Sequence, residues 1–197
     1  MTHHATDSTR RAMLASLAAL PVGTAAKTAE PPMTAGRNGD KMLVAYFSRT
    51  GNTRVIAGLL HRSLGAELFE IQPAQPYPDD YLQTVEQARQ ERDGGHARAV
   101  ARSIDLKNFD TVFLGFPIWG ETVPPVVRSF LAGQALEGKR LIPFITHGGY
   151  GAGNSQTVLA SYIPKGTLLQ GLVMEADQER RTMNQVNSWV KTLTLRG

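Results

Sequence analysis

Short apolar segments alternate with amphipathic segments from Lys41 to the end of this 197-residue chain. A short, continuous apolar run is typical of a strand buried on both faces, and apolar residues at helical spacing are typical of a surface helix. The alternation therefore predicts an α/β fold with a mostly parallel sheet. Five strands are expected, at Met42–Phe47, Glu67–Ile71, Thr111–Phe116, Leu141–Thr146 and Leu168–Met174.

The segments between these strands carry the apolar spacing of helices. Helices are expected over residues 55–64, 79–92, from 124 onward, 155–162 and 183–193. In the second helix the expected inner stripe consists of Tyr81, Leu82, Val85 and Ala88. Ser155 is expected to cap the fourth helix, because serine is a favoured N-cap residue.

Pro143 lies inside the fourth expected strand. Proline has no backbone N–H and cannot donate a hydrogen bond to a neighbouring strand. Its presence therefore counts against a central position of this strand in the sheet.

The composition excludes several classes of site. The chain has no cysteine, so disulfides, cysteine-bound zinc, iron–sulfur clusters and thiol nucleophiles are ruled out. Redox chemistry would then require a bound organic cofactor. The 21 Lys and Arg residues exceed the 17 Asp and Glu residues by four, but they are spread along the chain and do not indicate a nucleic-acid partner.

The first 40 residues differ in character from the rest. Arg10 and Arg11 precede a weakly apolar, alanine-rich run that ends near Ala26, and this arrangement looks like a twin-arginine export signal at residues 1–26. The run is shorter than the roughly 20 residues of a transmembrane helix, so no stable membrane insertion is expected after processing. A periplasmic location is expected, or a cytoplasmic one if the segment is only an extension. Residues 27–40 are expected to be a flexible linker before a domain at 41–197.

Ligands of an open parallel sheet bind beyond the carboxyl ends of its strands. The loop after the first strand contains Ser48, Arg49, Thr50, Gly51, Asn52 and Thr53. Hydroxyl groups and free N–H groups at the start of a helix favour an anion, which predicts a phosphate site. The loop lacks the dinucleotide-binding and Walker patterns. The alternative is an ordinary capped helix start.

Two further loops have unusual compositions. Pro117, Ile118, Trp119 and Gly120 follow the third strand, and the indole suits stacking on a flat ring, although it could instead fold back over the third helix. Thr146, His147, Gly148 and Gly149 follow the fourth strand, with Gly151 and Gly153 close behind. Such glycines allow the backbone to approach a ligand, although a mobile surface loop would have the same composition. His147 is interpreted as a lining residue, and no catalytic or metal-binding pattern is found.

The three loops together resemble those of a flavodoxin, most specifically in Thr50-Gly51-Asn52-Thr53, and the resemblance covers residues 42–195. It implies a short-chain, flavodoxin-like, doubly wound five-stranded sheet of order 2-1-3-4-5 in a three-layer α/β/α fold that binds FMN non-covalently. Residues 48–53 would then hold the phosphate. Residues 117–120 would lie along the isoalloxazine, with Trp119 stacked on it and the Gly120 carbonyl near N5. Residues 146–149 and Gly153 would hold the pyrimidine side. Tyr77 or Tyr81 would reach the rim.

The resemblance implies an FMN-dependent electron-transfer protein with a redox partner protein or a small acceptor such as a quinone. An NAD(P)H:quinone-type oxidoreductase is the alternative enzyme, and a flavin-free anion-binding module is a third hypothesis. The basic composition departs from the acidic character of most electron-carrier flavodoxins. Because Arg49 and Arg54 lie in the expected flavin loops with only Glu121 as an acid, we expect a less negative potential for the last electron.

Overall fold

The structure is a computed structural model that describes residues 40–176 and 179–193. The chain divides into two compact units, residues 1–31 and 32–197. The expected export signal at 1–26 and all but the last residue of the expected linker lie outside the described residues.

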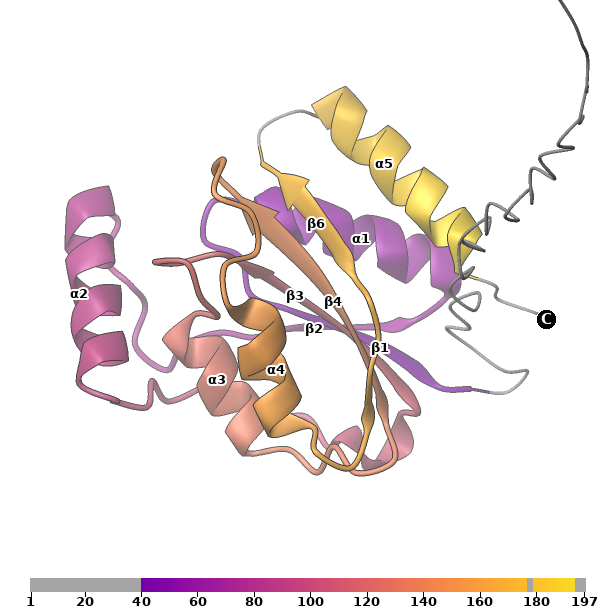
Figure 1. The fold of residues 1–197 in the computed structure, drawn as a ribbon, viewed down its shortest axis with the longest axis horizontal. Coiled ribbons are helices and arrows are strands. Elements are labelled where there is room, and N and C mark those ends of the chain that lie inside the picture. Colours follow the sequence, from indigo (N-terminus) through magenta and orange to yellow (C-terminus); the bar gives the residue numbers. More distant parts are fainter. Residues whose placement is uncertain (1–39, 177–178, 194–197) are drawn as a thin grey trace, which may run out of the picture. The chain divides into compact units, whose positions relative to one another are not determined.

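The strands form one parallel sheet in which β2, β1, β3, β4 and β5 are neighbours in that order, with β6 also paired to β4. Their bounds are β1 (Met42–Tyr46), β2 (Glu67–Glu70), β3 (Thr111–Pro117), β4 (Arg140–His147), β5 (Thr167–Leu168) and β6 (Leu172–Glu175). The order 2-1-3-4-5 and the flavodoxin-like doubly wound fold are thereby confirmed (Figure 1).

The helices are α1 (Asn52–Leu64), α2 (Tyr81–Asp93), α3 (Pro125–Ala132), α4 (Ser155–Tyr162) and α5 (Glu179–Thr192), and a short 3-10 turn, η1, spans Leu106–Asn108. Helices α1 and α5 cover one face of the sheet and α3 and α4 cover the other (Figure 1). The side chains of successive residues of β1 point to opposite faces of the sheet. Leu43 packs in the core beneath α3 and α4, whereas Val44 packs in the core beneath α1 and α5. This explains why the central strands are continuously apolar.

Pro143 occupies a central strand, contrary to the expectation from its missing N–H. It pairs with Leu114 of β3, while the other edge of β4 faces β5 and β6. The carbonyl of Leu141 accepts a hydrogen bond from Leu169, so Pro143, two residues further along, turns its backbone to that same edge. The expected single strand Leu168–Met174 is interrupted there. Gly171 passes so close that a Cβ atom on it would collide with the Pro143 carbonyl.

Helix α2 does not bury the stripe expected from its sequence. Tyr81, Leu82 and Val85 are 68%, 73% and 45% exposed, and the buried residues are Thr84 and Ala88. The reason is the position of the helix, which lies beyond the carboxyl ends of the strands rather than flat on the sheet (Figure 1). Tyr81, Val85 and Ala88 therefore line a cavity instead of the core, whereas Leu82 is exposed outside that lining.

The start of α4 also differs from expectation. Ser155 is the first residue of the helix rather than its cap, and Asn154 occupies the N-cap position without a side-chain hydrogen bond. The Ser155 hydroxyl is buried and has no hydrogen-bond partner. Its burial, which the local sequence pattern does not reveal, explains the wrong assignment.

Candidate functional site

A cavity of about 390 Å³ lies at the carboxyl ends of β1, β3 and β4. One side is formed by the three loops singled out in the sequence, and the opposite side is formed by α2. The loop residues that line it are Arg49, Thr50, Asn52, Pro117, Ile118, Trp119, Gly120, Thr146, His147 and Gly148, with Ala176 after β6. We call the α2 side the outer wall, and it consists of Tyr81, Thr84, Val85, Ala88, Arg89 and Arg92.

The loop after β1 leaves the start of α1 open to an anion. Gly51 occupies the N-cap position in the left-handed conformation, at φ 97°, and no side chain caps the first turn. The hydroxyl of Ser48 instead accepts a hydrogen bond from the Gly51 N–H at 3.2 Å. The first turn of α1 also contains no acidic residue. Its N–H groups are therefore available to a negative ligand beside Thr50 and Asn52.

Thr53 and Thr146 connect the first loop to the end of β4. Their hydroxyl oxygens are 2.9 Å apart, and both side chains are buried. This hydrogen bond fixes the start of α1 against β4, which holds two loops that are 93 residues apart in the sequence. Thr53 therefore lies beneath the cavity rather than on its surface.

The two arginines of the first loop have different surroundings. The guanidinium of Arg49 donates to the carbonyls of Pro78 and Asp79, at 3.2 and 2.5 Å, and lines the cavity. Arg54 instead forms an ion pair with Glu70 of β2 at 2.6 Å and is not part of the lining. Arg49 therefore adds positive charge to the site, whereas the charge of Arg54 is compensated outside it.

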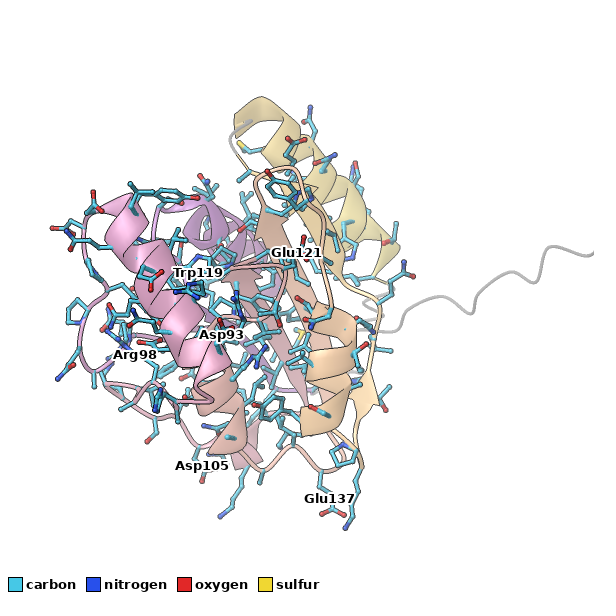
Figure 2. The ribbon with its side chains drawn as sticks, turned by 60° about the vertical axis from the view of Figure 1, so that its left-hand side comes forward. Asp93, Arg98, Asp105, Trp119, Glu121 and Glu137 are labelled. Carbon is cyan, nitrogen blue, oxygen red and sulfur yellow. The ribbon has the colours of Figure 1, made fainter. Side chains whose placement is uncertain are left out.

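Two other aromatic rings contact the Trp119 indole and fix its orientation. Its indole makes edge contacts with Phe47, at a centroid distance of 5.2 Å, and with Tyr77, at 4.7 Å. The side chain is half-buried and lines the cavity. The alternative in which this indole folds away over α3 is not what the structure has. Figure 2 shows Trp119 and Glu121 on the loop after β3.

The chain reverses immediately after Trp119 in a two-residue turn. Trp119 and Thr122 exchange backbone hydrogen bonds of 3.1 and 3.3 Å. Gly120 and Glu121 between them both have positive φ, 55° and 62°, as in a type I′ turn. Glu121 is a non-glycine residue in this region, which is sterically unfavourable. The turn places the exposed Gly120 at the cavity rim.

The loop after β4 contributes fewer residues to the cavity than the sequence predicts. His147 accepts a hydrogen bond from the Gly149 N–H at its Nδ1 atom, at 3.0 Å, which leaves the other ring nitrogen to carry the proton. Gly148 lines the cavity, whereas Gly149 does not. Gly153 lies against the backbone of Glu121 and lines a separate groove with Arg92, Arg128 and other polar residues.

The outer wall contains the site residues that sequence reasoning missed. Arg89 and Arg92 line the cavity, and a Cβ atom on Gly120 would collide with Nη1 of Arg92. Arg89 pairs with Glu86 at 2.8 Å, and Arg92 pairs with Asp93 at 2.8 Å. Both arginines resemble ordinary residues of a solvated helix face in the sequence. Tyr81, suggested from the sequence as a rim residue, does line the cavity.

Tyr77 lies behind Trp119 and not in the cavity lining. Its hydroxyl donates to Glu91 of α2 at 3.0 Å, and the guanidinium of Arg98 lies 4.2 Å from its ring centroid. Burial, followed by the charge and hydrogen bond of Glu91, raises the pKa of Tyr77 above its ordinary value. The Tyr77 ring is therefore a neutral support for Trp119 at every physiological pH.

Charge and shape define what this cavity accepts. Three arginines line it and no carboxylate does, within the described part of the chain. Residues 40–176 and 179–193 contain no cluster of three metal-ligating side chains. No helix in these segments is long and apolar enough to cross a membrane. A flat, partly apolar molecule with an anionic group at the α1 end matches the lining.

The family model for flavodoxin matches residues 41–193. No curated protein matches the chain. A solved protein of Bacteroides uniformis, assigned as a flavoprotein, is 29% identical over 78% of this chain and 99% of its own, with a TM-score of 0.68. A solved protein of Bacteroides eggerthii, also assigned as a flavoprotein, is 31% identical over 80% of this chain and 99% of its own, with a TM-score of 0.67. A Lactobacillus acidophilus flavoprotein in complex with FMN is 18% identical over 77% of this chain and 99% of its own, with a TM-score of 0.61. At this identity the likeness shows a shared fold and no more. The chain is thus a member of the flavodoxin family.

Proposed function

We propose that this flavodoxin binds one FMN in the cavity at the carboxyl ends of β1, β3 and β4 and transfers electrons between redox partners. The observation that carries the proposal is the convergence of three separate loops on one cavity, with an open helix start at one end and a supported indole at the other. The family match and the FMN complex of the Lactobacillus acidophilus protein support it.

The residues present fit a phosphate at the α1 end. Thr50 and Asn52 line the cavity beside uncapped N–H groups, and Arg49 supplies a positive charge. A monophosphate dianion placed there meets the positive end of the helix dipole and no acidic side chain of the first turn. Ser48 and Thr53 hold the loop in shape through their own hydrogen bonds.

The residues also fit a flat ring at the other end. Trp119 presents an indole whose orientation is fixed from behind by Phe47 and Tyr77. Val85 and Ala88 of the outer wall provide apolar surface opposite the loops. The loop residues 146–148 line the cavity side, where Gly148 has no side chain to cover the polar backbone groups. Such a lining excludes water from a ring while holding its polar edge.

FMN supplies the electron-transfer chemistry when it is bound, and the protein determines its orientation, exposure and potential. Gly120 lies exposed at the rim, so an incoming partner can approach the cavity there. A partner protein or a small acceptor such as a quinone would collect electrons at this rim. Arg49, Arg89 and Arg92 line the cavity, although Arg89 and Arg92 also pair with Glu86 and Asp93. Positive charge beside the flavin supports the expected less negative potential for the last electron.

The test is the visible absorption spectrum of the chain over residues 27–197, purified without added flavin and then titrated with FMN. We expect flavin bands and saturation at one FMN per chain. A protein that stays colourless and takes up no FMN would refute the proposed function. With FMN bound, bleaching by dithionite but not by NAD(P)H supports an electron carrier, whereas direct bleaching by NAD(P)H would assign the oxidoreductase alternative.

We also propose that residues 1–26 direct export by the twin-arginine route, which delivers the protein to the periplasm. The support is the Arg10-Arg11 pair before an alanine-rich run, together with the advantage of exporting a cofactor-loaded protein in the folded state. Replacement of both arginines by lysine is expected to retain the full-length chain in the cytoplasm. Periplasmic, shortened protein from that variant would contradict the proposal.

A further inference from the structure

Helix α2 forms the outer wall of the cavity but has little core packing of its own. Within its 13 residues the structure buries only Thr84 and Ala88. Three large apolar residues of the helix, Tyr81, Leu82 and Val85, are exposed. An amphipathic helix normally owes its position to burial of an apolar face. The position of α2 must therefore depend on other contacts.

Glu91, near the end of α2, makes the most buried ion pair of this helix in the described residues. One carboxylate oxygen lies 2.5 Å from Nη1 of Arg98, and the other accepts the Tyr77 hydroxyl at 3.0 Å. The side chains of Arg98 and Glu91 are 9% and 12% exposed, whereas those of the pair formed by Arg89 and Glu86 on the same helix are 55% and 50% exposed. The Glu91 pair is thus the sheltered ion pair of this helix.

Arg98 anchors Glu91 to the segment that precedes α2. Its Nη2 atom donates to the carbonyls of Gln75 and Pro76, at 2.5 and 3.1 Å. Its guanidinium also lies 4.2 Å from the centre of the Tyr77 ring. Figure 2 shows Arg98 and Trp119 on the side of the molecule where α2 lies. Both carboxylate oxygens of Glu91 are therefore held by groups outside α2.

The same cluster also supports the opposite side of the cavity. The ring of Tyr77, fixed by Glu91 and Arg98, contacts the edge of Trp119 at a centroid distance of 4.7 Å. A continuous series of contacts thus connects α2 through Glu91 and Tyr77 to Trp119. The separation between the outer wall and the indole depends on this series.

The energetics favour a positioning role over a gain in net stability. A buried ion pair contributes little compared with apolar residues of the same size, because both charges lose their hydration. The Nε atom of Arg98 is buried without a hydrogen-bond partner, which adds a further desolvation penalty. What the pair does provide is a fixed geometry between two segments.

We propose that Glu91 is a positioning residue that holds the outer wall and Trp119 at the separation required by a flat ring. The proposal rests on the proposed function, since the ring is that of FMN. It gives a specific role to a carboxylate that touches neither the cavity nor its ligand. Loss of Glu91 is expected to let α2 move and to release the Tyr77 ring that supports Trp119.

The test uses Glu91→Gln, which keeps the size of the side chain and removes its charge. Hydrogen exchange of the flavin-free protein is expected to accelerate at least about tenfold in α2 and not in α1. If the substitution lowers the population of the conformation with α2 in place to about one tenth, the dissociation constant of FMN rises about tenfold. Glu137→Gln is the matched control, because Glu137 pairs with Lys165 at a distance of 3.5 Å and both side chains are 73% exposed. We expect no change for this control.

Two results would overturn the proposal. One is a folded Glu91→Gln protein whose α2 exchange equals that of the unsubstituted protein. The other is faster exchange with unchanged FMN affinity and an unchanged spectrum of the bound flavin, which would leave Glu91 a purely structural residue. If Glu91→Gln does not fold, Tyr77→Phe removes one hydrogen bond to Glu91 and is expected to weaken FMN binding about threefold. Unchanged affinity in that variant would then overturn the proposal.

Failure of the proposed function is distinguishable from failure of this inference. If the unsubstituted protein takes up no FMN, the proposed function is refuted. The exchange measurement then decides alone whether Glu91 holds α2, since it requires no flavin. Acceleration confined to α2 would support that role, and its absence would overturn it.

Discussion

The indole of Trp119 lies edge-on to the phenol ring of Tyr77, with ring centroids 4.7 Å apart and an interplanar angle of 82°. Tyr77 belongs to the segment between β2 and α2, and Trp119 belongs to the loop after β3. Neither residue is close to the other in sequence. The contact fixes an aromatic side chain at the cavity from behind, which is the arrangement that a stacking partner of a flat ring needs.

Replacement of Tyr77 by leucine is expected to remove this support. Edge contacts between aromatic rings contribute about 0.5–1.5 kcal/mol beyond area burial. The free energy of unfolding should fall by at least that amount, and FMN should bind less tightly because Trp119 loses its fixed orientation. Tyr77→Phe keeps the ring, so the near-ultraviolet circular dichroism of Trp119 should persist in it and be lost in Tyr77→Leu. Equal spectra for both variants would contradict the assigned role of the ring.

The raised pKa of Tyr77 predicts a dependence of stability on alkaline pH. The folded protein retains this phenol proton to a higher pH than the unfolded chain, whose tyrosines ionise at a pH of about 10. The contribution to stability is therefore complete below that pH and is lost as the pH rises further. Denaturant unfolding at increasing pH should show a steeper decline for the unsubstituted protein than for Tyr77→Phe. Identical declines in the free energy of unfolding would show that Tyr77 does not contribute to the pH dependence of stability.

Asn52→Asp should separate the stability of the fold from the affinity for FMN. A carboxylate in the uncapped first turn of α1 interacts favourably with the helix dipole, by about 0.3–1 kcal/mol. The flavin-free protein should therefore become more stable, while repulsion of the phosphate weakens FMN binding at least about tenfold. Asn154→Asp makes the same change at the start of α4, which has no side-chain cap, and should raise stability without changing FMN affinity. Unchanged affinity in Asn52→Asp would place the phosphate elsewhere.

Arg92→Gln should make the midpoint potential of bound FMN more negative. The Arg92 guanidinium lies next to Gly120 at the cavity, and reduction adds negative charge that a nearby cation stabilises. An interaction of about 1 kcal/mol corresponds to about 40 mV for one electron. Arg62→Gln, near the opposite end of α1 and exposed, is the control and should leave the potential unchanged. Equal potentials in a redox titration of both variants would exclude Arg92 from this role.

Two glycine-to-alanine changes should have opposite effects on stability. Gly171→Ala would place a methyl group against the Pro143 carbonyl, and this clash with backbone should destabilise by more than about 2 kcal/mol. Gly58 lies inside α1 and would meet only the flexible end of Arg62, at 3.3 Å. Gly58→Ala should stabilise by about 0.5–1 kcal/mol because alanine favours a helix. Chemical denaturation measures both, and a tolerated Gly171→Ala would contradict the close approach to Pro143.

The sequence predicts the architecture well because the relevant signals are local. Continuous apolar runs such as Met42–Phe47 identify buried strands, and helical spacing such as that of Val55 to Leu64 identifies the helices between them. Parallel strands place their carboxyl ends at one edge. The loops after the first, third and fourth strands were therefore expected to meet, and residues from all three line one cavity. The Trp119 side chain at this cavity was also predicted.

Where the sequence prediction failed, the cause lies in contacts between distant segments. The interruption between β5 and β6 arises because the edge of Pro143 that lacks an N–H faces them, and edge orientation depends on which strands become neighbours. The stripe of Tyr81, Leu82 and Val85 was expected in the core because periodicity reports which residues share a helix face, not what that face meets. Their exposure follows from the place of α2 beyond the strand ends.

The sequence by itself determined the order of strands and helices, the identity of the three loops and the absence of any thiol chemistry. Only the tertiary structure decided what lies opposite those loops. Arg89 and Arg92 line the cavity, whereas Arg54 forms an ion pair with Glu70 outside it. Glu91 forms an ion pair with Arg98 and accepts a hydrogen bond from Tyr77. The physical reason is that local patterns follow from the geometry of one element, whereas charge placement and ring contacts depend on how separate elements pack.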